Sequence, residues 1–210
     1  MKLFTFFRSS AAYRARIALN LKGLSYDMTS IVFAKGDHLS PAYQAVNPQK
    51  RVPTLELDDG SRVYQSLAMM EYLDEVHPQP PFLPRDPFER AHARAIAQIV
   101  ACDIHPLNNV GPLNYLRKQL GQSEDAINAW YHHWVLEGFE AIESLITPSP
   151  YAAGAAVTVA DICLVPQIYN ARRFKVPLDA FPKILAVEEA CNAIEAFDRA
   201  RPENQPDATA

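Results

Sequence analysis

The hydrophobic positions of the first 80 residues change their period several times. Apolar residues run together over 2–7, recur every three or four positions over 11–22, and run together again over 26–32. Continuous short runs are typical of buried strands, and the intermediate spacing is typical of a helix with one apolar face. We therefore expect strand, helix and strand over these ranges. The polar residues expected on the other faces of the helix are Arg14, Arg16, Asn20 and Lys22.

Two more strands and a second helix are predicted downstream. A turn at 58–60 joins the runs at 52–57 and 62–64, which indicates an antiparallel hairpin, and a helix is expected over 66–76. The first helix connects its two strands by a crossover, which makes that pair parallel. The order β-α-β and then β-β-α predicts a small mixed sheet of the thioredoxin-like kind over residues 1–80.

Prolines are frequent in the segment that follows the last of these helices. They fix φ and remove backbone donors, so we place a domain linker at 81–87. Beyond it the apolar spacing is helical, which predicts an all-α bundle domain over 88–210 whose first long helix is bent or interrupted at Pro106 and Pro112. From Pro202 onward the residues are polar, and we expect order there only if the segment docks on the rest. The fold class is therefore α+β.

Composition narrows the classes of function. The formal net charge is -4 and no run of lysine or arginine is present, so neither nucleic-acid nor membrane binding is indicated. The chain has no stretch of roughly 18 apolar residues and no signal-peptide pattern. We expect a cytoplasmic protein with a small-molecule partner. The cysteines lie in apolar helical patterns, which favours reduced, buried thiols. They are Cys102, Cys163 and Cys191.

Motifs for metal and nucleotide binding are missing from the sequence. Asp103 and His105 diverge on a helix and have no third partner at ligand spacing, so no metal site is expected. The chain has no glycine-rich phosphate loop, no HExxH and no Ser-His-Asp signature, so neither ATP nor NAD is expected.

Candidate chemistry lies where strands lead directly into helices. Ser9 and Ser10 stand at the first junction, where hydroxyls and unpaired N–H groups fit either a helix cap or a bound anion such as a thiolate. Gln65 and Ser66 stand at the second, where a plain N-cap and a bound carboxylate are both possible. Thr158 opens the string Thr-Val-Ala-Asp, which predicts a capping box.

Two further segments of the sequence each fit more than one interpretation. Val52 precedes Pro53 at a strand entrance, where the missing N–H fits an edge strand or a cis peptide, and where exposed backbone could pair with a peptide ligand. Arg172 and Arg173 form either a solvated charge pair or a cation facing an anionic substrate.

Several strings in this chain resemble the zeta class of the glutathione S-transferase superfamily, which includes maleylacetoacetate and maleylpyruvate isomerases. The resemblance runs nearly end to end and keeps the same order. The strings are FFRSSAAYRARIALNLKG (6–23), NPQKRVPTLELDDG (47–60), YQSLAMMEYL (64–73), CDIHPLNN (102–109) and VTVADICLVPQIYNARRFKV (157–176).

The resemblance implies glutathione as the cofactor and a homodimer as the assembly. It implies that Ser9, with Ser10 beside it, donates to the glutathione sulfur, and that Val52 pairs with the tripeptide backbone before a cis-Pro53. The γ-glutamyl end would be held by Gln65 and Ser66. Four residues match glutathione contacts or their supports in the family, some of them across the dimer: His38, His105, Asn108 and Asn109.

The reaction implied is the glutathione-dependent cis–trans isomerisation of a maleyl diacid to its fumaryl isomer. Arg173 matches the arginine that faces the substrate's negative charge, and Arg8 lies beside the thiol site. Ala11 stands where many zeta members have cysteine, which puts reactions through a protein thiol in doubt. Two alternatives stay open: a general transferase that conjugates or dehalogenates small electrophiles, and a non-catalytic binding module.

Overall fold

The computed structural model describes residues 1–208, and its contacts divide the chain into two units. The first unit comprises Met1–Phe82 and the segment from Asn192 onward, and the second comprises Leu83–Cys191. The sequence-based division placed everything after residue 88 in the helical domain. The structure corrects that at the C-terminal end, because the segment after Asn192 packs against the first unit.

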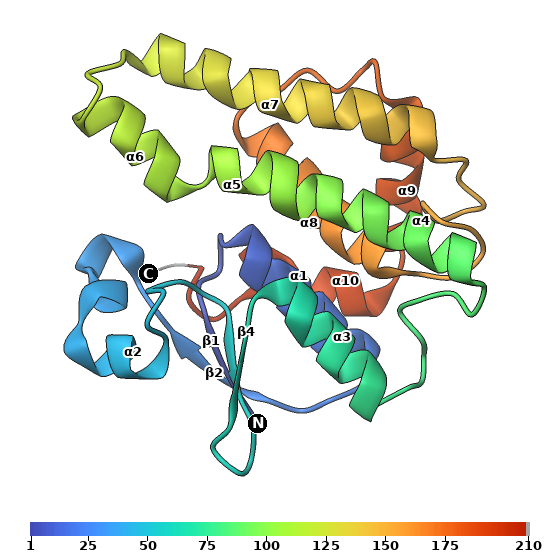
Figure 1. Cartoon of the computed structure of the whole chain (residues 1–210), viewed down its shortest axis with the longest axis horizontal. Helices are drawn as coiled ribbons and strands as arrows, with labels where there is room; N and C mark the ends of the chain where they lie inside the picture. Colours follow the sequence, from blue (N-terminus) through green and yellow to red (C-terminus); the bar gives the residue numbers. More distant parts are fainter. Residues whose placement is uncertain (209–210) are drawn as a thin grey trace. The chain divides into compact units, whose positions relative to one another are not determined.

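The first unit is built on a four-stranded mixed sheet in the order β2-β1-β3-β4 (Figure 1). β1 pairs parallel with β2 and antiparallel with β3, and β3 pairs antiparallel with β4. These pairings confirm the predicted crossover and hairpin, although three of the strands are shorter than predicted. The strands are β1 (Lys2–Thr5), β2 (Asp27–Ser30), β3 (Thr54–Glu56) and β4 (Arg62–Tyr64).

Helices α1, α3 and α10 of the first unit pack together beside the sheet (Figure 1). The first α-helix and the helix after the hairpin lie close to their predicted ranges. The elements are α1 (Ser10–Leu21), η1 (Phe33–Lys35), η2 (Asp37–Leu39), α2 (Pro41–Val46), α3 (Ser66–Val76), α10 (Glu195–Ala200) and η4 (Pro202–Asn204).

Helix α1 is enclosed rather than amphipathic, which corrects the prediction for its polar faces. Arg14 is 2% exposed and Arg16 is 0% exposed. Lys22, just after α1, has a buried side chain that donates to an Asp74 carboxylate oxygen at 2.8 Å. A buried cation needs hydrogen-bonding partners, so these residues join α1 to its neighbours instead of to solvent.

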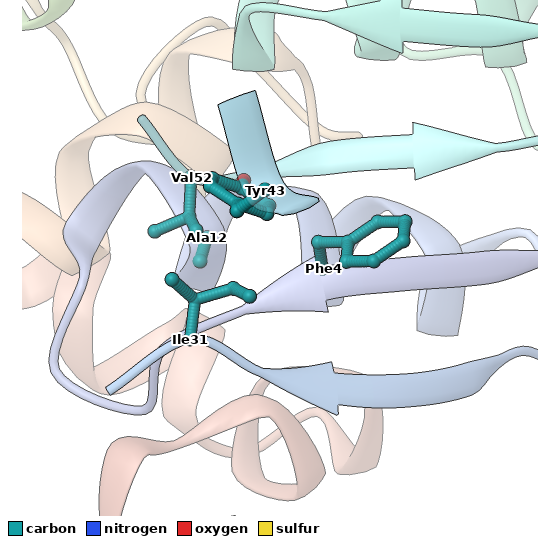
Figure 2. Packing of buried hydrophobic residues seen from close by; sticks show 5 residues of the cluster. All are labelled: Phe4, Ala12, Ile31, Tyr43 and Val52. Atoms are coloured by element: carbon teal, nitrogen blue, oxygen red, sulfur yellow. The ribbon is translucent and has the colours of Figure 1, made fainter. Parts of the chain in front are cut away.

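A hydrophobic cluster closes the end of the sheet from which β1 leads into α1 (Figure 2). The side chains come from β1, α1 and α2 and from the segments after β2 and before β3. Their packing fixes the first turn of α1 against the segment that precedes β3. The five residues drawn are Phe4, Ala12, Ile31, Tyr43 and Val52.

The regular elements described in the second unit are all helices, as the apolar spacing predicted, apart from an isolated β-bridge between Tyr151 and Gly154. Its first long helix passes through a π-type segment and is broken at Asn109, whose backbone is extended with ψ 163. The capping box at Thr158 is confirmed, with Asp161 accepting from the Thr158 N–H at 2.8 Å. The elements are α4 (Pro87–Gln98), η3 (Ile99–Ile104), α5 (His105–Asn108), α6 (Val110–Lys118), α7 (Glu124–Leu145), α8 (Val159–Arg173) and α9 (Pro182–Asn192).

The cysteines only partly fit the expectation of buried thiols. All three are free, and Cys163 and Cys191 are buried, but Cys102 is exposed. Cys102 lies in the π-type segment η3, two residues after the buried Val100 and two before the buried Ile104, so it falls off the buried face of the helix. None of the described helices is long and apolar enough to cross a membrane.

Gly138 of α7 packs closely against η3 in the second unit. A Cβ on Gly138 would lie 2.3 Å from Cδ1 and 2.4 Å from Cγ1 of the buried Ile104. Gly138→Ala is therefore expected to lower the thermal unfolding midpoint by a few degrees, since overpacking costs about 1–3 kcal/mol and better helix propensity returns only about 1 kcal/mol. The exposed Glu140 on the same helix supplies the control, Glu140→Ala. A higher midpoint for Gly138→Ala would contradict the close packing.

Candidate functional site

The sheet topology brings four candidate segments of the first unit to one edge. β1, β2 and β4 run in the same direction and β3 runs oppositely, so the ends of the first three and the start of β3 share an edge. Residues 8–10 follow β1 and residue 38 follows β2. Residues 52–53 precede β3, and residues 65–66 follow β4. Helices α1 and α3 both begin at this edge, and their positive N-terminal ends favour a bound anion there.

Ser9 is the N-cap of α1. Its Oγ accepts the Ala12 N–H at 3.2 Å, so its own hydroxyl hydrogen remains available for donation to a second acceptor. Ser10, the first helical residue, is buried at 4% exposure. The neighbouring Arg8 is exposed, with its guanidinium carbon 4.8 Å from the centre of the Phe7 ring. The junction is therefore a helix cap whose hydroxyl hydrogen is left to donate.

The start of α3 is not a plain side-chain cap. Gln65 is the N-cap residue with φ 65 and ψ 124, and its side chain makes no capping hydrogen bond. A positive φ at a residue other than glycine is strained and occurs often at ligand sites. The Gln65 side chain donates instead to Gln49 Oε1 at 2.9 Å, and the Ser66 hydroxyl accepts from Arg14 Nη1 at 3.3 Å. The side chains of both residues are therefore held by neighbouring residues at the start of α3.

The peptide bond between Val52 and Pro53 is cis. β3 begins at Thr54, so the Val52 backbone lies outside the strand ladder and next to it. β3 is an inner strand, so the interpretation of Pro53 as an edge-strand proline is wrong. The segment is fixed because the Tyr43 hydroxyl donates to the Arg51 carbonyl at 2.6 Å.

His38 lies in η2 with its ring stacked on Phe33 at 4.3 Å. Burial lowers the pKa of His38, the positive charge of Arg51 lowers it further, and Asp37 opposes both effects. The imidazole is therefore neutral at physiological pH. Its Nδ1 is buried and has no hydrogen-bond partner among the described residues. A buried polar atom of this kind is a candidate for a ligand contact.

Three predicted residues lie around α5 in the second unit. His105 Nε2 and Asn109 Nδ2 are 3.3 Å apart, and Asn109 also caps α6 through the Val110 N–H. Asn108 is 9% exposed and donates to the Tyr131 carbonyl at 3.3 Å. Asn108 Oδ1 is buried without a partner within residues 1–208. The structure thus brings the His105 and Asn109 side chains together, whereas the Asn108 side chain bonds to α7.

The two arginines at the end of α8 have different surroundings. Arg172 is held by Glu188, with Nε 3.2 Å from Oε1. Arg173 is exposed and its guanidinium carbon lies 4.9 Å from the centre of the Phe174 ring. Burial raises the pKa of Tyr131, and the positive charge of Arg173 partly offsets that rise. Arg172 thus forms an ion pair with Glu188 at the surface. The exposed charge of Arg173 is available to an anionic substrate, which is the second of the two alternatives.

Several polar residues that hold the site together were not predicted. They are buried or half-buried side chains whose partners are distant in sequence, so no periodicity reveals them. Asn47, for example, is 1% exposed and donates to both the Arg51 carbonyl and the Thr54 hydroxyl. Within residues 1–208 no group of three or more His, Cys, Asp or Glu side chains could hold a metal ion. The supporting residues are Arg14, Tyr43, Asn47 and Gln49.

Known proteins resemble the chain in both sequence and fold. The family model "Glutathione S-transferase, N-terminal domain" matches residues 8–76. The maleylacetoacetate isomerase of Pseudomonas aeruginosa is 48% identical over 212 residues, with 100% of each chain covered. The chain therefore belongs to the glutathione S-transferase family and, within it, to the zeta class.

Two solved structures share the fold at full length. One is the holo structure of maleyl pyruvate isomerase, a bacterial zeta-class glutathione S-transferase, with a TM-score of 0.96, 47% identity and coverage of 99% of this chain and 100% of that one. The other is the maleylacetoacetate isomerase of Methylobacterium extorquens AM1 with bound malonate and glutathione. It has a TM-score of 0.96 and 35% identity, with 100% of both chains covered.

Proposed function

We propose that this protein is a glutathione-dependent isomerase that converts a maleyl diacid, maleylpyruvate or maleylacetoacetate, to the fumaryl isomer. The observation that carries the proposal is the 48% identity to a maleylacetoacetate isomerase over the whole chain. A related structure at 35% identity holds glutathione together with malonate, which is a short diacid. A diacid substrate is consistent with the exposed arginines of both units.

The sheet edge of the first unit fits a tripeptide thiol. The Val52 backbone, outside the ladder, would pair with the extended peptide. Gln65, Ser66 and the N-terminal end of α3 would hold the γ-glutamyl carboxylate. His38 Nδ1, buried and without a partner among the described residues, would gain one from the ligand. In the second unit we assign His105, Asn108 and Asn109 to glutathione contacts or to their support.

The proposed role of the Ser9 region is to keep the thiol of bound glutathione ionised. When bound, glutathione would supply a nucleophilic sulfur whose reversible addition to the substrate double bond leaves a single bond that can rotate before the sulfur is expelled. Ser9 would donate its hydroxyl hydrogen to that sulfur, with Ser10 and the positive end of α1 beside it. Lowering a thiol pKa by about two units requires preferential stabilisation of the thiolate by roughly 2.7 kcal/mol. Hydrogen bonds to a charged acceptor and the end of a helix together supply energies of this size.

The substrate carboxylates require cations. Arg8 and Arg173 fill this role in the proposal, because both guanidinium groups are exposed. Arg172 is already paired with Glu188. A guanidinium binds a carboxylate by two parallel hydrogen bonds, which orients the diacid as well as holding it.

A competition assay separates this proposal from a general transferase. We expect maleylpyruvate or maleylacetoacetate to suppress any conjugation of a chloro-aromatic substrate, and the diacid to turn over faster. Faster conjugation that the diacids do not inhibit would favour the general transferase. Failure of the protein to bind to immobilised glutathione would favour a non-catalytic module.

We further propose that the protein is a cytoplasmic homodimer. Free cysteines, one of them exposed, fit a reducing compartment. The homodimer is what the resemblance to the zeta class implies, and an exposed apolar side chain such as Phe88, at 81% exposure, is available to an interface. Light scattering after size-exclusion chromatography is expected to give twice the 23.5 kDa chain mass. A mass equal to that of one chain would refute the dimer.

A further inference from the structure

The C-terminal segment of the chain contacts the turn that precedes α1. Asp207 Oδ2 accepts the Phe7 N–H at 3.1 Å, across 200 positions of sequence. Both groups are enclosed, since Asp207 is 7% exposed and Phe7 is 6% exposed. A buried charge–amide hydrogen bond is stronger than one in water and is costly to lose, so this contact is a strong restraint on the Phe7 backbone.

Arg16 binds the carbonyl group of Phe7, the residue whose N–H is bound by Asp207. Its Nη2 donates to the Phe7 carbonyl at 3.0 Å and its Nη1 donates to the Thr5 hydroxyl at 3.1 Å. Its Nε donates to the Ala200 carbonyl at 3.1 Å, which ties α1 to the end of α10. The N–H and the carbonyl of Phe7 are therefore both fixed by buried charged side chains.

The C-terminal segment is itself anchored, so Asp207 approaches Phe7 from a fixed base. Gln205 is 7% exposed, and its Nε2 donates to the carbonyls of Arg199 and Arg201 at 2.9 and 2.8 Å. Phe197 of α10 is fully buried. These contacts explain why the polar segment after Pro202 is docked.

The restrained residue belongs to the turn that leads into the candidate sulfur site. The Ser9 N–H donates to the Phe6 carbonyl at 3.0 Å, which closes a four-residue turn with Phe7 and Arg8 at its centre. The orientation of the Phe7 peptide therefore sets the direction of Arg8 and the position of the Ser9 cap.

We propose that Asp207 is a positioning residue for the glutathione sulfur site, holding the Phe6–Ser9 turn so that the Ser9 hydroxyl faces the sulfur. This inference rests on the proposed function and adds a residue to it from the opposite end of the sequence. Asp207 acts through the turn and does not itself touch the ligand.

Full-length variants test the role of Asp207. Asp207→Ala removes the acceptor, Asp207→Leu replaces it by a larger apolar side chain and serves if the alanine variant does not fold, and Asp207→Asn keeps an acceptor oxygen. Glu203→Ala, an exposed change in the same segment, is the matched control. Three quantities are measured: amide hydrogen exchange over residues 6–9, ultraviolet titration of the bound glutathione thiol, and kcat/KM for isomerisation.

In the alanine and leucine variants we expect the amide hydrogens of residues 6–9 to exchange faster and the thiol pKa of bound glutathione to rise. We expect kcat/KM for isomerisation to fall about tenfold. We expect Asp207→Asn to stay within about threefold of wild type, and Glu203→Ala to match it. Unchanged exchange over 6–9, or an unchanged thiol titration in a variant that only unfolds at lower temperature, would overturn the proposal. If the wild type binds no glutathione, the proposed function fails, and hydrogen exchange still decides whether Asp207 holds the turn.

Discussion

Replacing Arg173 by alanine is expected to lower kcat/KM for maleylpyruvate or maleylacetoacetate about 100-fold, which corresponds to about 2.7 kcal/mol of transition-state stabilisation. Arg173 ends α8 with an exposed guanidinium and makes no salt bridge with any residue from 1 to 208. Its charge is therefore available for a substrate carboxylate. Because the proposed glutathione contacts lie elsewhere, we expect the Kd for glutathione to stay within about twofold of wild type.

The neighbouring arginine provides a matched control for Arg173. Arg172→Ala removes an identical side chain whose charge is already paired with Glu188, so it is expected to keep near-wild-type turnover. Arg173→Lys keeps the charge but loses the two-pronged geometry, and we expect an intermediate rate. Wild-type kinetics in Arg173→Ala, or equal losses in both alanine variants, would refute the assigned role.

The second large effect is expected at Ser9. Ser9→Ala removes the proposed donor to the glutathione sulfur, and a hydrogen bond to a charged acceptor contributes about 1.5–3 kcal/mol. The pKa of bound glutathione should therefore rise by about one to two units, and kcat/KM at neutral pH should fall about 10- to 100-fold. Because the unfavourable change lies in thiol ionisation, the loss should shrink as the pH is raised above the new pKa. Ultraviolet titration of the thiolate measures the shift directly.

Ser9→Ala also removes a helix cap, so its effect on stability must be separated from its effect on the thiol. Ser123 caps α7 with a bond of the same 3.2 Å length to the Ala126 N–H. Ser123→Ala should therefore cost a similar stability of about 1 kcal/mol and leave the thiol titration unchanged. A thiol pKa that moves equally in the two variants, or in neither, would contradict the role of the Ser9 hydroxyl.

The local parts of the fold were predictable because local chemistry determines them. The turn at 58–60, the junction at Ser9 and the capping box at Thr158 each depend on neighbouring residues, and the structure contains each of them. The mixed sheet followed from the handedness and length of its connections. Among site residues, the strand-to-helix junctions were found in the same way.

Features that depend on distant partners were not predictable from periodicity. Arg16 looks like a solvated residue on a helix, but it is fully buried because carbonyl groups of Phe7 and Ala200 accept from it. The segment around Asp207 looks like a loose polar tail, but it docks on the first unit. The ligand roles of the site residues stay predictions for the variants to test.

The proposed isomerase activity is tested most directly by an assay of maleylpyruvate and maleylacetoacetate, side by side, with and without glutathione. We expect at least one of the two diacids to be converted to its fumaryl isomer, with glutathione required and not consumed. No turnover of either diacid with glutathione present, or equal turnover without it, would contradict the proposed function.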